Sequence, residues 1–248
     1  MILHPAPRVR EIYPHVYMFS FENQYDVNMH FLRYQEFYES PNPDFRNATF
    51  NLVDYMRWYS IDRTGAGGLG IFSYPNDWSG FNVPCWVFSK LFYDLGIPDE
   101  NIYDRNMREA FEAIKAIEGD HVFYIVGCVE LGAALEHELA HGLWYVSPDY
   151  QAEMRGAVAW LKHTHVEVYN ALRHTLVTEG YCADVVEDEI NAYIATGFSE
   201  ALLAPIVATG CTDETLSLIK ERFTEIFARY SKDAQLPWII DRAQDTPS

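Results

Sequence analysis

The chain has 248 residues, of which 49 % are hydrophobic, so it is long enough to bury a substantial core and is neither disordered nor fibrous. Its 36 acidic and 18 basic residues give a formal net charge of −18 at pH 7. A surface this acidic repels phosphate groups. We therefore expect neither nucleic acid nor an anionic membrane as a partner.

The sequence favours a cytoplasmic location. The four cysteines are far apart and form no CxxC pair, which argues against a cysteine-based metal site and agrees with reduced thiols. No stretch approaches the roughly 20 apolar residues that cross a bilayer, and the N-terminus lacks the basic and apolar regions of an export signal. We therefore expect a cytoplasmic protein without a membrane anchor.

The first part of the chain is predicted to begin with a strand and continue with helices. Aromatic and β-branched residues predict the strand at 13–21. Apolar residues at three- and four-residue spacing predict helices at 24–39 and 49–60. Glycines and prolines then predict a long irregular loop over 61–84, and long loops inside compact domains are often functional.

The rest of the chain is predicted to be helical apart from one buried strand at 121–127. The helices expected there cover residues 85–95, 103–118, 129–146, the stretch from 148 toward 179, 183–196 and 212–230. Gly119 is expected to end one of these helices, and Ser147 to cap the start of another. The sequence thus predicts one helix-rich α+β domain over residues 1–248, with a small sheet.

An HExxH motif, His137-Glu138-Leu139-Ala140-His141, lies in the predicted helix at 129–146. Four residues at about 100° each turn the helix by about 400°, so both imidazoles project from one face and can reach a single Zn²⁺. From its place between them, Glu138 cannot easily bind the same ion, but it can reach a water held by the metal. Zinc lowers the pKa of such a water to about 7, so a nearby carboxylate can take its proton.

The pattern of the same helix supports a site on the histidine side. Its leucines form one stripe, the natural core-facing side, and the two histidines lie nearly opposite on a face with small alanines. A buried structural histidine is expected within the leucine stripe instead. The leucines of the stripe are Leu131, Leu135, Leu139 and Leu143.

Around His137 and His141 the sequence resembles the zincin metallopeptidases, in which a helix below a small sheet bears HExxH. The resemblance covers about twenty residues and a downstream helix. It implies that both histidines bind zinc and that Glu138 is the general base. The metzincin branch is excluded, because Trp144 and Ser147 stand where that branch has glycine and a third histidine.

The gluzincin branch takes a glutamate from a later helix, here the predicted helix at 183–196. On a helical wheel Glu189 falls about 50° from the centre of the apolar face, whereas the neighbouring acids Glu187 and Asp188 lie more than about 100° away. A carboxylate pointing inward needs a partner, which zinc would supply. We therefore predict Glu189 as the third ligand. Glu187 is the alternative, because a polar residue, Asn191, follows it by four positions as in gluzincin-type motifs.

Other residues stay open as site candidates. His163 and His165 are a less favoured source of a ligand, since residues two apart diverge on a helix. Either histidine, Tyr145 or Tyr193 is a candidate for stabilising the oxyanion of the tetrahedral intermediate. A carboxylate such as Glu130 as a fourth ligand would instead close the metal site.

The sequence thus predicts a zinc metallopeptidase in which Zn²⁺ and Glu138 activate a water that attacks a peptide or protein substrate. One alternative is a non-catalytic binding or regulatory protein that contains zinc. A second is a helix-rich interaction protein without metal, in which His137 and His141 are surface residues.

Overall fold

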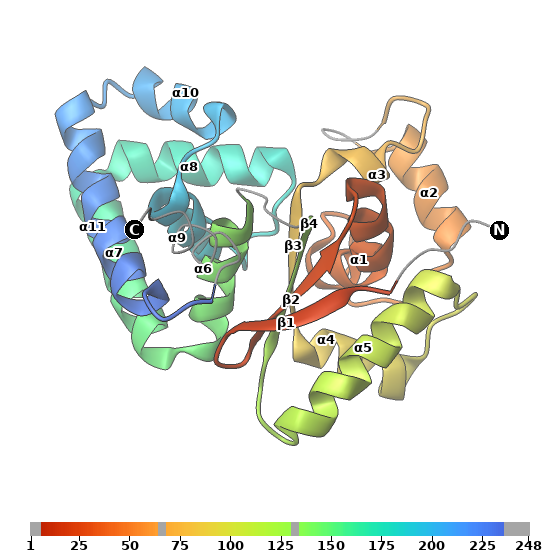
Figure 1. Ribbon diagram of the computed structural model, residues 1–248. Coiled ribbons are helices and arrows are strands. Elements are labelled where there is room, and N and C mark those ends of the chain that lie inside the picture. The colour runs from red at the N-terminus through yellow and green to blue at the C-terminus, as the bar shows by residue number, and fades with distance from the viewer. Residues whose placement is uncertain (1–5, 64–67, 130–133, 236–248) are drawn as a thin grey trace, which may run out of the picture. The chain divides into compact units, whose positions relative to one another are not determined.

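The computed structural model describes residues 6–63, 68–129 and 134–235 (Figure 1). The chain is rich in helices and has one small mixed sheet, which confirms the predicted α+β class. It divides into two compact units: Met1–Leu135 with Asp233–Ser248, which carries the sheet, and Glu136–Lys232, which is helical. That residues 1–248 fold as a single domain stays a prediction, because compactness alone does not decide whether each unit folds by itself.

The sheet has four strands in the order β1-β2-β4-β3. The two central strands, β2 (Val16–Phe21) and β4 (Tyr124–Val129), are parallel. The edge strands, β1 (Arg8–Tyr13) and β3 (Gly80–Pro84), are antiparallel to their neighbours. Nearly all side chains of the central pair are buried, as expected of strands covered on both faces.

The predicted strand at 13–21 is wrong at its start, because Pro14 and His15 form a turn between β1 and β2. Strand β1 was not predicted; its first four residues are exposed and include three charged side chains. That composition is typical of an edge strand, which has little apolar periodicity to detect. The second predicted strand is present, but β4 begins three residues later, at Tyr124.

Five helical segments accompany the sheet: α1 (Gln24–Glu39), α2 (Leu52–Ile61), α3 (Tyr74–Asp77), α4 (Cys85–Ser89) with the π-helical segment η1 (Lys90–Leu95), and α5 (Ile102–Glu118). Helix α5 starts with a capping box on Asn101 and ends at Gly119, whose φ of 62° suits glycine. The segment 61–84 is not irregular throughout, because it contains α3 and β3. The apolar residues of β3 are few and flanked by turn residues, so they resemble a loop in sequence.

Helix α1 packs against β2, β3 and β4 and fixes the core of this unit. The Phe31 ring stacks on Phe81, with 5.2 Å between ring centroids and 9° between planes. Gly127 in β4 leaves room for that ring, since a Cβ there would lie 2.2 Å from a ring carbon of Phe31. The close approach therefore requires glycine.

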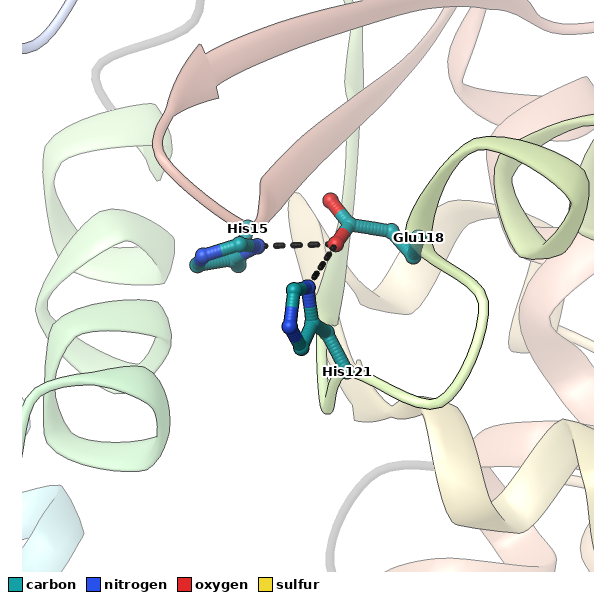
Figure 2. A group of neighbouring side chains, drawn as sticks. All are labelled: His15, Glu118 and His121. Carbon is teal, nitrogen blue, oxygen red and sulfur yellow. Dashed lines mark hydrogen bonds and ion pairs between the residues drawn. The ribbon is translucent and has the colours of Figure 1, made fainter.

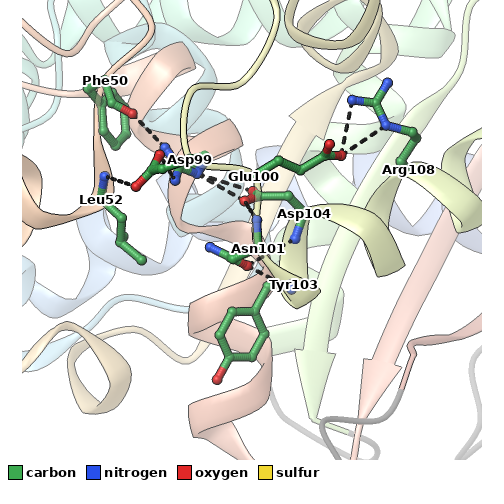
Figure 3. Close-up of polar contacts among 9 residues, drawn as sticks. Phe50, Leu52, Asp99, Glu100, Asn101, Tyr103, Asp104 and Arg108 are labelled. Carbon is green, nitrogen blue, oxygen red and sulfur yellow. Dashed lines mark hydrogen bonds and ion pairs between the residues drawn. The ribbon is translucent and has the colours of Figure 1, made fainter.

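A buried polar network ties α1 to the start of α5 (Figure 3). The Arg33 guanidinium lies 3.2 Å from Asp104 and 2.7 Å from Asp99, and it also donates to the carbonyl of Phe50. The side chains of Arg33 and Asp104 are 6 % and 3 % exposed. Removing one member would leave the other buried without its counter-charge, which is strongly destabilising.

The helical unit contains α6 (Ala134–Val146), α7 (Pro148–Thr164), α8 (Val166–Glu179), α9 (Val186–Thr196), α10 (Glu200–Ala208) and α11 (Asp213–Ser231). Helix α9 contacts α7, α8 and α11 (Figure 1). The Ser147 side chain caps α7 as predicted, and Gly180 with φ 107° ends α8.

The helical unit differs from the prediction in several places. Val129 belongs to β4, so the helix predicted from 129 is wrong there, and the structure describes it only from Ala134. The stretch from 148 to 179 is two helices that meet at His165. Helix α10 was not predicted, and Pro205 lies inside it.

The four cysteines, all within the described residues, are not disulfide-bonded, and Cys85, Cys128 and Cys182 are buried. Over the described residues, no single helix has both the length and the apolar character to cross a membrane. Helices α9 and α10 together pass the same test by length and composition, but they are bent by 96° at the break between them.

Candidate metal centre

Helix α6 presents the HExxH residues toward α9. Leu135, Leu139 and Leu143 are fully buried, as the predicted stripe requires, whereas Leu131 lies outside the described residues. The histidine side is also covered: the side chain of His141 is 1 % exposed and that of His137 is 18 % exposed. Both sides of α6 are therefore covered, because side chains of α9 lie against the histidine side.

Three donor atoms from two helices converge here. The Nε2 atoms of His137 and His141 are 3.2 Å apart. Glu189, in the first turn of α9, places Oε1 3.6 Å from Nε2 of His141 and Oε2 3.8 Å from Nε2 of His137. The predicted ligand set His137, His141 and Glu189 is thus brought together within the helical unit.

These separations fit a metal better than a hydrogen-bonded cluster. Zinc with bonds of about 2.0–2.1 Å in tetrahedral geometry holds its ligand atoms about 3.3–3.4 Å apart. The distance between the two Nε2 atoms, 3.2 Å, and those from them to the two different oxygens of Glu189, 3.6 and 3.8 Å, lie around that value. The contacts to Glu189 are too long for hydrogen bonds but close to the spacing of two ligands on one ion.

The burial of Glu189 also calls for a cation. The residue is 2 % exposed, and within the described part of the chain its Oε2 atom is buried without a hydrogen-bond partner. A buried carboxylate oxygen left unpaired is unfavourable by several kcal/mol. A divalent cation between Glu189 and the two imidazoles would satisfy this oxygen.

Burial and the neighbouring charges shift the pKa values of all three residues of the cluster. Burial alone would lower the pKa of His141, but Asp188 and Glu189 outweigh it and raise that pKa well above its usual value. Burial and then the neighbouring His141 lower the pKa of His137. Burial raises the pKa of Glu189 to about 8, although His141 acts to lower it. A metal that binds here must therefore displace protons from its ligands.

Asp188 is a site residue that the sequence analysis missed. Its Oδ1 lies 3.0 Å from Nδ1 of His141, the ring nitrogen on the far side from the donor cluster. Asn191 donates to the same oxygen at 3.3 Å and accepts from the hydroxyl of Tyr150 at 2.7 Å. A carboxylate on the second nitrogen of a metal-binding histidine fixes the tautomer and the ring orientation. The signal available in the sequence was that Asp188 directly precedes Glu189, the predicted ligand.

Glu138 and Tyr193 lie at the same site. Glu138 is 5 % exposed, and it is close enough to influence the charge states of His141, Glu189 and Tyr193. The Tyr193 ring lies 4.4 Å from the His137 ring, and its hydroxyl is 3.1 Å from that of Tyr181. Burial raises the pKa of Tyr193 to about 12, so its hydroxyl stays protonated and able to donate at neutral pH.

The other candidates lie elsewhere. Glu187, the alternative third ligand, is exposed on α9. His163 is exposed near the end of α7, and the ring of His165 lies 5.0 Å from that of Trp160. Tyr145 is in the last turn of α6 and half-buried. Glu130, the residue considered for closing the site, lies outside the described residues.

Comparison of the chain with protein-family models, with curated proteins and with solved structures finds no match. The function is therefore argued from the chemistry of this site.

Proposed function

We propose that the protein is a zinc-dependent hydrolase, most specifically a gluzincin-like metallopeptidase, with Zn²⁺ held by His137, His141 and Glu189. The observation that carries the proposal is the triangle of two imidazole Nε2 atoms and one buried carboxylate, with edges of 3.2 to 3.8 Å. Three protein ligands are the set that leaves a fourth position for chemistry, whereas structural zinc sites use four. Within the described residues the cluster has these three members.

Zinc in this position supplies two effects, the acidification of water and the polarisation of a substrate carbonyl. Glu138 is the group to accept the proton of the water and deliver it to the leaving amine nitrogen. Glu138 lies close enough to the cluster for its charge to act on both His141 and Glu189. Asp188, whose Oδ1 is 3.0 Å from Nδ1 of His141, would hold the proton on that nitrogen and so leave Nε2 available to bind the metal.

We place this activity in the cytoplasm, in line with four cysteines that are not disulfide-bonded. The proposed substrate class is peptides or proteins, which the HExxH arrangement with a glutamate base favours. The rival function, a zinc-containing binding or regulatory protein, shares the ligands but has no use for Glu138 as a base.

The deciding experiment compares Glu138→Gln with the unaltered protein. Both are loaded with zinc, the metal content is measured, and hydrolysis of a quenched-fluorescent peptide mixture is followed. We expect one zinc to remain at this site in the variant while the rate falls by about 10²–10⁴, the usual contribution of a general base. Glu136→Gln, a half-buried glutamate in the same turn of α6, is the matched control and should keep its activity.

Two results would contradict the proposal. One is the absence of any divalent metal after preparation without a histidine tag. The other is zinc binding by His137 and His141 with no hydrolysis of any peptide in the mixture, which would favour the binding protein instead.

A further inference from the structure

A second group of metal-ligating side chains lies in the sheet unit, well separated in sequence from the HExxH helix. His15 and His121 both direct Nδ1 toward the same carboxylate oxygen, Oε2 of Glu118 (Figure 2). The distances to that oxygen are 2.8 Å from His15 and 3.7 Å from His121. All three atoms lie within 4.8 Å of one another.

The carboxylate of Glu118 is held in place by a hydrogen bond from the sheet. Its side chain is 5 % exposed, at the end of α5. The hydroxyl of Tyr17 in β2 donates to the other oxygen, Oε1, at 2.6 Å. Because Oε1 is engaged, Oε2 is the oxygen presented to the two rings.

The two histidines come from different segments, and their backbones are fixed. His15 has φ 66° in the turn between β1 and β2, its N–H donates to Glu11, and its carbonyl accepts from the N–H of Tyr124 in β4. His121 follows the turn that ends α5, and its N–H donates to the carbonyl of Glu118 at 3.1 Å. The fold thus fixes the backbone positions from which the two rings project.

We propose that His15, Glu118 and His121 form a second metal site, which takes a divalent transition-metal cation such as Zn²⁺. One hydrogen bond from one imidazole would satisfy Oε2, yet a second imidazole faces the same oxygen at a distance too long for a hydrogen bond. Two imidazoles and a carboxylate are a donor set that zinc and its first-row neighbours prefer. The chain's net charge of −18 further favours a bound cation.

The site is open to solvent, unlike the cluster on α6 and α9. The side chains of His15 and His121 are 44 % and 75 % exposed, so the remaining coordination positions face water. A cation here would connect the β1–β2 turn to the end of α5 and the start of β4. Its role is to clamp these three segments, and it should raise the melting temperature because the unfolded chain lacks the site.

The test is a zinc titration of the metal-free full-length protein by calorimetry. We expect two zinc ions per chain in the unaltered protein. The variant His15→Ala/His121→Ala and the variant His137→Ala/His141→Ala should each lose one equivalent. Adding zinc to the second variant should still raise its melting temperature, and adding it to a variant that lacks all four histidines should not.

A matched control is His163→Ala/His174→Ala, which removes two exposed histidines from helices and should still bind two ions. Should His15→Ala/His121→Ala fail to fold, His121→Ala alone serves, because its side chain is mostly exposed. The proposal is overturned if neither His15→Ala/His121→Ala nor His121→Ala lowers the number of zinc ions bound per chain. The absence of a zinc anomalous peak between these three residues in zinc-loaded crystals also overturns it. A single ion at His15 would instead support this site and contradict the proposed function.

Discussion

The contact between Asp188 and His141 gives the sharpest test of the metal centre, because it can be weakened without touching a ligand. In Asp188→Asn, the side chain that lies 3.0 Å from Nδ1 of His141 keeps its shape but loses its charge, so a hydrogen bond to that nitrogen would be neutral instead of charged. A hydrogen bond to a charged group contributes about 1.5–3 kcal/mol and a neutral one about 0.5–1.5 kcal/mol, so the difference is about 1–1.5 kcal/mol. At about 1.4 kcal/mol per tenfold change, we expect zinc to bind about tenfold more weakly.

The assay is a competition between the metal-free protein and a chromophoric zinc chelator at fixed neutral pH. It is carried out in the His121→Ala background, so that the second proposed site does not contribute. Glu187→Gln is the matched control, because it removes the same charge from the neighbouring, exposed position of α9. Solvent screens an exposed charge, so this control should change the zinc affinity by less than about twofold.

The proposed role of Asp188 is refuted if Asp188→Asn binds zinc as tightly as the background protein. It is equally refuted if Glu187→Gln loses as much affinity, since the effect would then be one of overall charge. A tenfold loss confined to Asp188→Asn would show that this carboxylate acts through the Nδ1 atom of His141.

Three further predictions concern the stability of the fold, measured by urea unfolding. Gly127→Ala should lower the free energy of unfolding by about 1–3 kcal/mol through overpacking. Gly156→Ala, at an exposed helix position where an added Cβ meets open space, should instead raise the free energy of unfolding by up to about 1 kcal/mol. Equal changes in stability for the two glycine variants would contradict this account. Arg33→Met should lower the free energy of unfolding by about 3–5 kcal/mol, because it leaves the buried carboxylate of Asp104 without its counter-charge. Arg108→Met, which removes a half-exposed ion pair, should lower it by at most about 1 kcal/mol. Burial raises the pKa of Glu36 above 4.5, so stability present below that pH is lost as the pH rises through the folded-state pKa. Glu36→Gln cannot titrate and should gain stability relative to the unaltered protein between pH 4 and 7, and a constant difference would count against this explanation.

Local signals predicted the helices well where they are self-contained. Helix α1 has the predicted bounds, and its N-cap, Asn23, accepts from the N–H of Asp26 within the same turn. The edge strands β1 and β3 were missed because their stability depends on pairing with β2 and β4, which a short sequence window does not contain.

The candidate site was predictable to the extent that it follows from helix geometry. His137 and His141 are one turn apart on α6, and the helical wheel selected Glu189 from its neighbouring acids. Asp188 was missed because a wheel describes directions around one axis, whereas a side chain in the first turn of α9 can reach sideways to α6. That contact depends on how the two helices cross, which no pattern within α9 encodes.

The two proposed metal sites differ in how visible they are in the sequence, for a physical reason. His137 and His141 are brought together by a single helix, so their spacing alone carries the signal. His15 and Glu118 are 103 positions apart, and what joins them is the register of the parallel pair β2 and β4, which sets Val16 opposite Tyr124. This register places the turn before β2 beside the segment before β4, and hence beside the end of α5. A shift of that register would separate His15 from Glu118 while leaving the HExxH spacing intact, so the second site depends on the sheet in a way that the first does not.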